Sequence, residues 1–209
     1  QPDYVARPSI AYAPDSYGRS VFGGTTVVLS DMLGNHRLAM AGEVNGRVSE
    51  SALYFGYSNF GHRLQHTTAF AQTPYYFLSN DSLVPVQGDP LTNIEKQEIT
   101  TFVARQLFAT SAYPMNRFTR LELGAGLNSV GRHRIFLQRA ILNLSLASPF
   151  TIDSIRNDPD LNYAELHVAL VSDNTLSGDN GPLLGRRYRL QLSPVAGGLS
   201  WIEYLVDYR

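Results

Sequence analysis

Apolar and polar residues alternate one by one along several segments of the chain. Between Arg37 and Val44, one side of an extended chain carries Leu38, Met40 and Val44, while the other side carries Arg37 and Glu43. Successive residues of a β-strand point to opposite faces of a sheet. This segment is therefore predicted to be a strand with one apolar and one polar face.

The same alternation recurs in two later segments, 120–128 and 187–192. Their charged positions are Arg120, Glu122, Arg187 and Arg189, and their apolar positions are Leu121, Leu123, Leu127, Tyr188, Leu190 and Leu192. Period-two alternation over this length predicts half-buried or half-solvated strands, not helices.

Short turn signals separate the predicted strands. Gly34-Asn35-His36 lies between two β-favouring runs, and Tyr113-Pro114-Met115-Asn116 lies between two more, so both are expected to close hairpins. Further strands are expected over 51–58, 64–73, 132–144, 161–172, 186–193 and 200–208, and surface loops over 79–98 and 150–160. The chain is therefore predicted to be all-β, an antiparallel meander of about ten strands over residues 22–209, after a connecting arm over 1–21.

Two settings produce such alternation, a soluble sheet with one buried face and a transmembrane β-barrel. The chain has no run of about 18 apolar residues, so any membrane crossing must be made by strands. Twelve Tyr and ten Phe, several of them near predicted strand ends, favour the aromatic girdles of a barrel. In that case the charged positions named above would line a lumen, and the apolar ones, with Leu38, Met40 and Val44, would face lipid.

Three segments resemble BamA-type surface-antigen barrels, which in some large envelope proteins follow a TolB-like β-propeller. They are the run from Phe22 to His36, the run from Ser111 to Phe118, and Asp173-Asn174 followed by the run from Gly181 to Tyr188. The resemblance spans Phe22 to Tyr208 and implies the N-terminal part of an outer-membrane barrel in a superfamily that inserts or secretes proteins. Such barrels are expected to have about 16 strands, more than this chain supplies, and to end in an aromatic strand signal that Tyr208-Arg209 does not match.

Catalytic and metal-binding motifs are missing from the sequence. Zero Cys excludes disulfides, thiolate zinc sites and Cys nucleophiles, and there is no Gly-x-Ser-x-Gly, His-Glu-x-x-His or P-loop motif. His62 and His66 would lie about 13 Å apart on one strand, too far for one metal ion. The segment from Asp173 to Leu184 resembles a calcium loop but has Leu184 where a bidentate Glu is needed. We therefore expect no enzyme activity, no cofactor and no metal.

The sequence favours a non-enzymatic protein of the bacterial outer membrane, acting in protein insertion, export or envelope assembly. Its expected partners are membrane lipid and other envelope chains that complete or cover a barrel edge. The formal net charge of -1 gives no support for nucleic-acid binding. Two alternatives stay open: a soluble secreted β-sandwich or barrel that binds a ligand or protein partner, and a structural subunit of a larger envelope complex.

Overall fold

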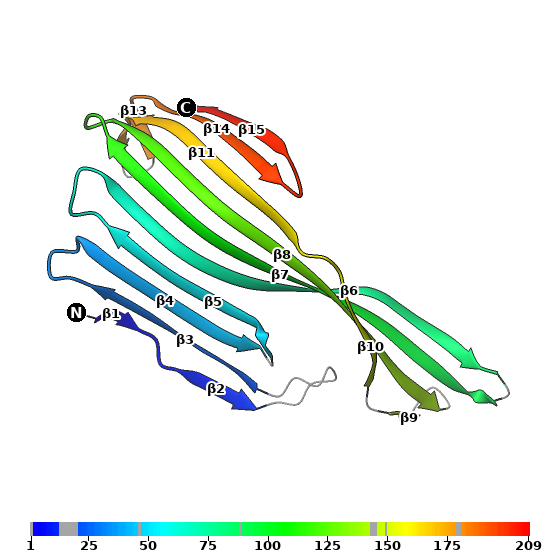
Figure 1. Cartoon of the computed structure of the whole chain (residues 1–209). Coiled ribbons are helices and arrows are strands. Elements are labelled where there is room, and N and C mark those ends of the chain that lie inside the picture. Colours follow the sequence, from blue (N-terminus) through cyan, green and yellow to red (C-terminus); the bar gives the residue numbers. More distant parts are fainter. Residues whose placement is uncertain are drawn as a thin grey trace.

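The chain folds into strands joined by turns and short connections (Figure 1). The computed structural model describes residues 2–12, 21–45, 47–87, 89–142, 146–148, 150–178 and 181–209. The strands are β1 (Pro2–Val5), β2 (Ser9–Tyr12), β3 (Val21–Ser30), β4 (His36–Asn45), β5 (Arg47–Asn59), β6 (Gln65–Val86), β7 (Asp89–Pro114), β8 (Thr119–Leu142), β9 (Leu146–Ala147), β10 (Thr151–Asn157), β11 (Leu161–Asp173), β12 (Leu176–Gly178), β13 (Gly181–Leu184), β14 (Arg187–Gly197) and β15 (Trp201–Tyr208).

Thirteen of these strands form one antiparallel sheet, and β12 and β13 form a small separate hairpin. The main path of the sheet is β1-β3-β4-β5-β6-β7-β8-β11-β14-β15, with β2 also on β3 and with β9 and β10 on β8. Neighbours in the sheet are neighbours in sequence, apart from the short strands. The predicted all-β antiparallel meander of about ten strands is confirmed.

The sheet is curved but not closed into a barrel. Figure 1 shows β1 and β2 at one edge and β15 at the other. Among the described residues, no strand pairing joins β15 to β1 or β2. The outer backbone groups of both edges therefore lack a strand partner within this part of the chain.

The predicted hairpins at 34–36 and 113–116 are confirmed. Gly34 has φ 71°, a left-handed conformation that favours glycine, in the turn between β3 and β4. In the turn between β7 and β8, the Asn116 Oδ1 accepts hydrogen bonds from the backbone N–H of Phe118 and Thr119, each 2.8 Å long.

Three segments predicted as arm or loop contain strands. Within the arm predicted over 1–21, β1 and β2 pair with β3. The loop predicted over 79–98 is the far part of the β6–β7 hairpin, in which pairing runs from Gln65↔Ala112 to Val86↔Asp89. The loop predicted over 150–160 contains β10, which pairs with β8. Proline predicts a loop in 79–98, but Pro85 lies at a register shift near the end of β6 and Pro90 is the second residue of β7, positions that tolerate proline.

The three longest strands, β6, β7 and β8, extend the sheet beyond the ends of the other strands. β6 has 22 residues, β7 has 26 and β8 has 24, whereas β3 and β4 have 10 each. We call residues 74–86, 89–103 and 131–142 of these strands, with β9 and β10, the extension (Figure 1). A small hydrophobic cluster of Ile99, Ile135 and Leu137, with Phe150 packed against it, stabilises the extension.

The pairing of β2 with β3 depends on the absence of a side chain at residue 23. A Cβ at Gly23 would collide with the carbonyl oxygen of Ser9. We expect Gly23→Ala to weaken this pairing by about 1–3 kcal/mol, as overpacking does, measured as faster amide hydrogen exchange over Ser9–Tyr12. Gly42→Ala is the matched control, because its Cβ would meet only the Leu53 Cδ2 at 3.7 Å. Equal exchange in the two variants would contradict this account.

Candidate functional site: an exposed apolar face and a covered polar face

Cross-strand register brings the apolar side chains of the sheet together on one face. One row runs across five strands, from Met40 through Phe55, Phe70 and Leu107 to Leu127. A second row, four residues away along β8, joins Leu123, Val168, Leu192 and Tyr204 of β8, β11, β14 and β15. We call this the apolar face of the sheet and the opposite one its polar face.

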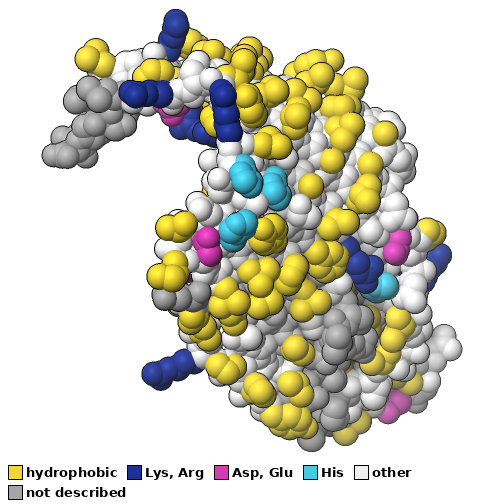
Figure 2. Space-filling model, turned by 60° about the vertical axis from the view of Figure 1, so that its left-hand side comes forward, with side chains coloured by type: hydrophobic (Ala, Val, Ile, Leu, Met, Phe, Trp, Pro, Cys, Tyr) yellow, Lys and Arg dark blue, Asp and Glu magenta, His cyan; other side chains and the backbone are white. Residues whose placement is uncertain are grey.

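On β8, β11 and β14 the apolar face is the more exposed of the two, whereas on β4 Arg37 and Glu43 of the polar face are more exposed than Leu38 and Met40. On β11, Leu166 and Val168 of the apolar face are 56% and 46% exposed, whereas Ala169 and Val171 of the polar face are 1% and 3% exposed. β8 alternates in the same sense over residues 122–128 and β14 over residues 189–196. In Figure 2, hydrophobic side chains spread over the visible surface of the curved sheet. A soluble sheet shows the opposite order, with its apolar face covered.

Along β8, the apolar face is about as long as a strand that crosses a membrane. On β8 it is bounded by the hydroxyl residues Thr119 and Ser129, and the segment between them is the nine residues 120–128. A transmembrane strand needs roughly 9–11 residues. The next row beyond Leu127 is polar and includes Gln72, Arg105, Ser129 and Asn162.

All fifteen residues singled out in the sequence lie on the predicted faces. The polar face carries Arg37, Glu43, Arg120, Glu122, Arg187 and Arg189, and the apolar face carries Leu38, Met40, Val44, Leu121, Leu123, Leu127, Tyr188, Leu190 and Leu192. That these faces contact a watery lumen and lipid stays a prediction.

Glu122 is the centre of an ionic group on the polar face. Its carboxylate pairs with the Arg120 Nε at 2.6 Å on the same strand and with the Arg189 Nη1 at 2.8 Å on β14. β11 lies between these strands, and the small side chain of Ala169 is its register partner for Glu122. A hydrogen bond of 2.9 Å from Arg189 to Gln191 extends the group along β14. Three of the six charges that alternation predicted, those of Arg120, Glu122 and Arg189, are therefore paired with one another.

Two glycines of β8 make room for polar side chains from β11. A Cβ at Gly124 would collide with the ring of His167, and one at Gly126 would come 3.0 Å from the Glu165 side chain. Glu165 also accepts a hydrogen bond of 3.4 Å from Gln106 of β7. Glu165 and His167 are not among the residues predicted for this face, although they alternate with Leu166 and Val168 in the sequence.

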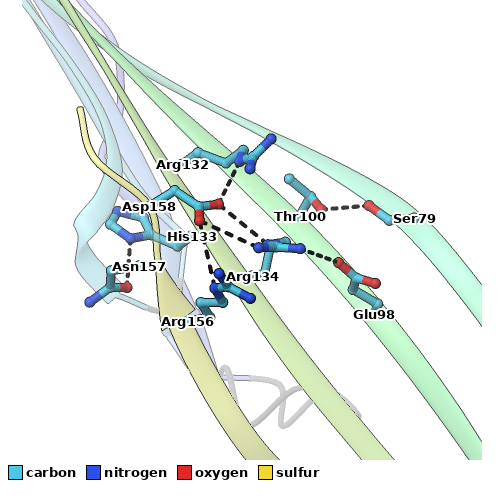
Figure 3. A network of polar contacts seen from close by, with 9 residues as sticks. All are labelled: Ser79, Glu98, Thr100, Arg132, His133, Arg134, Arg156, Asn157 and Asp158. Atoms are coloured by element: carbon cyan, nitrogen blue, oxygen red, sulfur yellow. Dashed lines mark hydrogen bonds and ion pairs between the residues drawn. The ribbon is translucent and has the colours of Figure 1, made fainter. Parts of the chain in front are cut away.

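A second ionic network holds the extension together (Figure 3). Asp158 pairs with the Nε of Arg132 at 2.6 Å, of Arg134 at 3.3 Å and of Arg156 at 3.8 Å. Arg134 also pairs with Glu98 at 3.7 Å, so that β7, β8 and the end of β10 are linked.

The hydrogen bond from Arg132 to Asp158, together with the charges of Arg132 and Arg134, holds the pKa of the Asp158 carboxyl below its ordinary value, against an opposing effect of desolvation. A lowered carboxyl pKa means that this attraction is complete above the ordinary value of 3.8 and is lost as the pH falls through the lowered pKa. The network therefore persists at neutral pH.

Over the described ranges, no group of three His, Asp or Glu side chains is placed to hold a metal ion. Asp173, the first residue of the calcium-like segment, accepts hydrogen bonds from the backbone and hydroxyl of Thr175 at 3.1 and 2.6 Å, as in a turn. Residues 179 and 180 of that segment lie outside the described residues.

Comparisons of the chain with protein-family models, curated proteins and solved structures found no match. The resemblance to BamA-type barrels therefore stays a prediction from the residues. The part of the chain that the structure describes contains no helix long and apolar enough to cross a membrane.

The Glu122 group predicts the effect of removing its carboxylate charge. Because the Glu122 side chain is only 18% exposed and pairs with two arginines, we expect Glu122→Gln to lower the free energy of unfolding by about 1–3 kcal/mol, measured by urea titration of the folded protein. Asp207→Asn is the control, since the Arg209–Asp207 pair is exposed and such pairs contribute about 1 kcal/mol or less. A loss no larger for Glu122→Gln than for Asp207→Asn would refute the role given to Glu122.

Proposed function

We propose that this chain forms part of the wall of a β-barrel in the bacterial outer membrane. In this proposal the apolar face contacts lipid and the polar face borders water. The observation that carries it is the order of exposure on β8, β11 and β14, where leucines and valines of the apolar face are the more exposed, while the opposite face carries the less exposed Glu122 carboxylate, paired with Arg120 and Arg189. Lipid is the environment in which an outward apolar face of this extent is stable.

Two further features support a membrane-spanning wall. The apolar stretch of β8 has the length that a tilted strand needs to cross a bilayer. Across the apolar face, β4, β5, β6, β7, β8, β11 and β14 each pair with a neighbouring strand on both sides, which is a requirement for spanning hydrocarbon. Of the alternatives left open by the sequence, the soluble sandwich needs a second layer over the apolar face, and the described residues provide none.

The wall would act without catalysis, in the insertion or export of proteins or in envelope assembly. This part of the proposal is supported by the resemblance to BamA-type barrels. It is also supported by the two open edges, because unpaired backbone groups at membrane depth need further strands as partners. The open edges equally favour the second candidate, a structural subunit held in a larger envelope complex by strand addition.

An arginine on the apolar face distinguishes lipid from water around it. We expect Leu123→Arg to cost about 2–4 kcal/mol in a bilayer, because a charge near the membrane centre loses its hydration. Urea unfolding in phospholipid vesicles measures this cost. Leu205→Arg is the matched control: the same exchange on β15 places the charge on the polar face, in line with Glu203 and Asp207.

Fractionation is the companion measurement. The native chain should stay with membranes through a carbonate wash and give a β-rich circular dichroism spectrum after detergent extraction. Release into plain buffer, together with similar costs for Leu123→Arg and Leu205→Arg, would contradict the membrane proposal.

A further inference from the structure

A shallow groove of about 460 Å³ lies where the apolar face meets its polar border. Its apolar side is formed by Phe70, Leu107, Leu127 and Ala164, which belong to β6, β7, β8 and β11. Its polar side includes Arg105 and Ser129, which are register partners in the next row. The groove therefore places an apolar surface next to the cationic side chain of Arg105.

The Nε of Arg105 is held by a hydrogen bond, while part of its side chain is exposed to solvent. Its Nε donates a hydrogen bond of 3.0 Å to the Gln72 Oε1, and the Gln72 Nε2 donates one of 2.8 Å to the Ser51 carbonyl oxygen. Gln72 and Ser51 are only 8% and 1% exposed, whereas the Arg105 side chain is 37% exposed. A buried relay thus fixes the direction of a solvent-accessible guanidinium group.

A carboxylate follows one row farther from the apolar surface. The Asp160 Oδ2 lies 4.0 Å from the Arg105 Nη1, and the Asp160 side chain is 44% exposed. Its Oδ1 lies 3.2 Å from where a Cβ of residue 131 would be, so that Gly131 leaves room for the carboxylate. Moving along β8 from Leu127 past Ser129 to Gly131, the surface is thus first apolar, then basic, then acidic.

We propose that this groove binds a phospholipid with a phosphoethanolamine headgroup. The apolar, basic and acidic side chains follow one another in the same order as the groups of that lipid. An acyl chain would lie along Leu107 and Leu127, the phosphate at Arg105, and the terminal ammonium at Asp160. Arginine binds phosphate through several N–H donors, and a carboxylate pairs with a primary ammonium. A purely anionic headgroup would pair with Arg105 but would be repelled by Asp160. This inference rests on the proposed membrane location.

The test measures which lipids the protein retains. The whole chain is folded in nanodiscs that contain equal amounts of phosphatidylethanolamine and phosphatidylcholine, and the protein is then gently extracted and its bound lipids are identified by native mass spectrometry. We expect the wild type to retain phosphatidylethanolamine preferentially, because the quaternary nitrogen of choline carries three methyl groups and has no N–H to donate to Asp160. Asp160→Asn should remove the preference. Arg105→Gln should lower retention of both lipids about fivefold, the effect expected for loss of one basic contact.

Two further variants control for folding. Arg105→Lys keeps the charge and should keep part of the retention, whereas Arg120→Gln alters an arginine on the polar face and should leave retention unchanged. Unchanged retention in Arg105→Gln, or a folded and inserted wild type without lipid preference, would overturn the site while leaving the membrane proposal intact. Failure of the wild type to insert at all would overturn both.

Discussion

The structure depends on one constraint: in a curved sheet whose residues alternate between faces, the face that is turned outward must match its surroundings. Here the outward face carries large apolar side chains such as Leu166 and Val168, and the covered face carries the Glu122 group. Each Å² of apolar surface left in water costs roughly 25 cal/mol relative to burial. In the membrane location that we propose, lipid would remove this cost without a second protein layer.

The covered face meets a different demand, because charges that leave bulk water need partners. Arg120 and Arg189 converge on one carboxylate, and the small residues Gly124, Gly126 and Ala169 leave space for longer side chains from neighbouring strands. Opposite charges also lie together at the border of the apolar face, where Arg105 and Asp160 meet. Charged side chains thus occur at the covered face, at the border and in the extension, while the apolar band between the borders is free of them across β8, β11 and β14.

Much of this arrangement could be predicted from local sequence, and the rest required knowledge of register. Alternation in 37–44, 120–128 and 187–192 is a property of adjacent residues, so the faces and the meander followed directly. The strands in 2–12 and in 79–98 were missed because Pro and Gly are ambiguous signals until a partner strand is known. Arg105 and Asp160 are 55 residues apart (160 − 105), and only the pairing of β7, β8 and β11 brings them together.

The measurement that tests the central claim most directly is cysteine accessibility along β11. The chain has no Cys, so single substitutions at Glu165, Leu166, His167 and Val168 can each be labelled without background. In vesicles, a charged maleimide should label cysteines at 165 and 167, which lie on the polar face, and leave those at 166 and 168 unlabelled in lipid. Ready labelling at 166 and 168, with protection at 165 and 167, would mean that water covers the apolar face and would contradict the account.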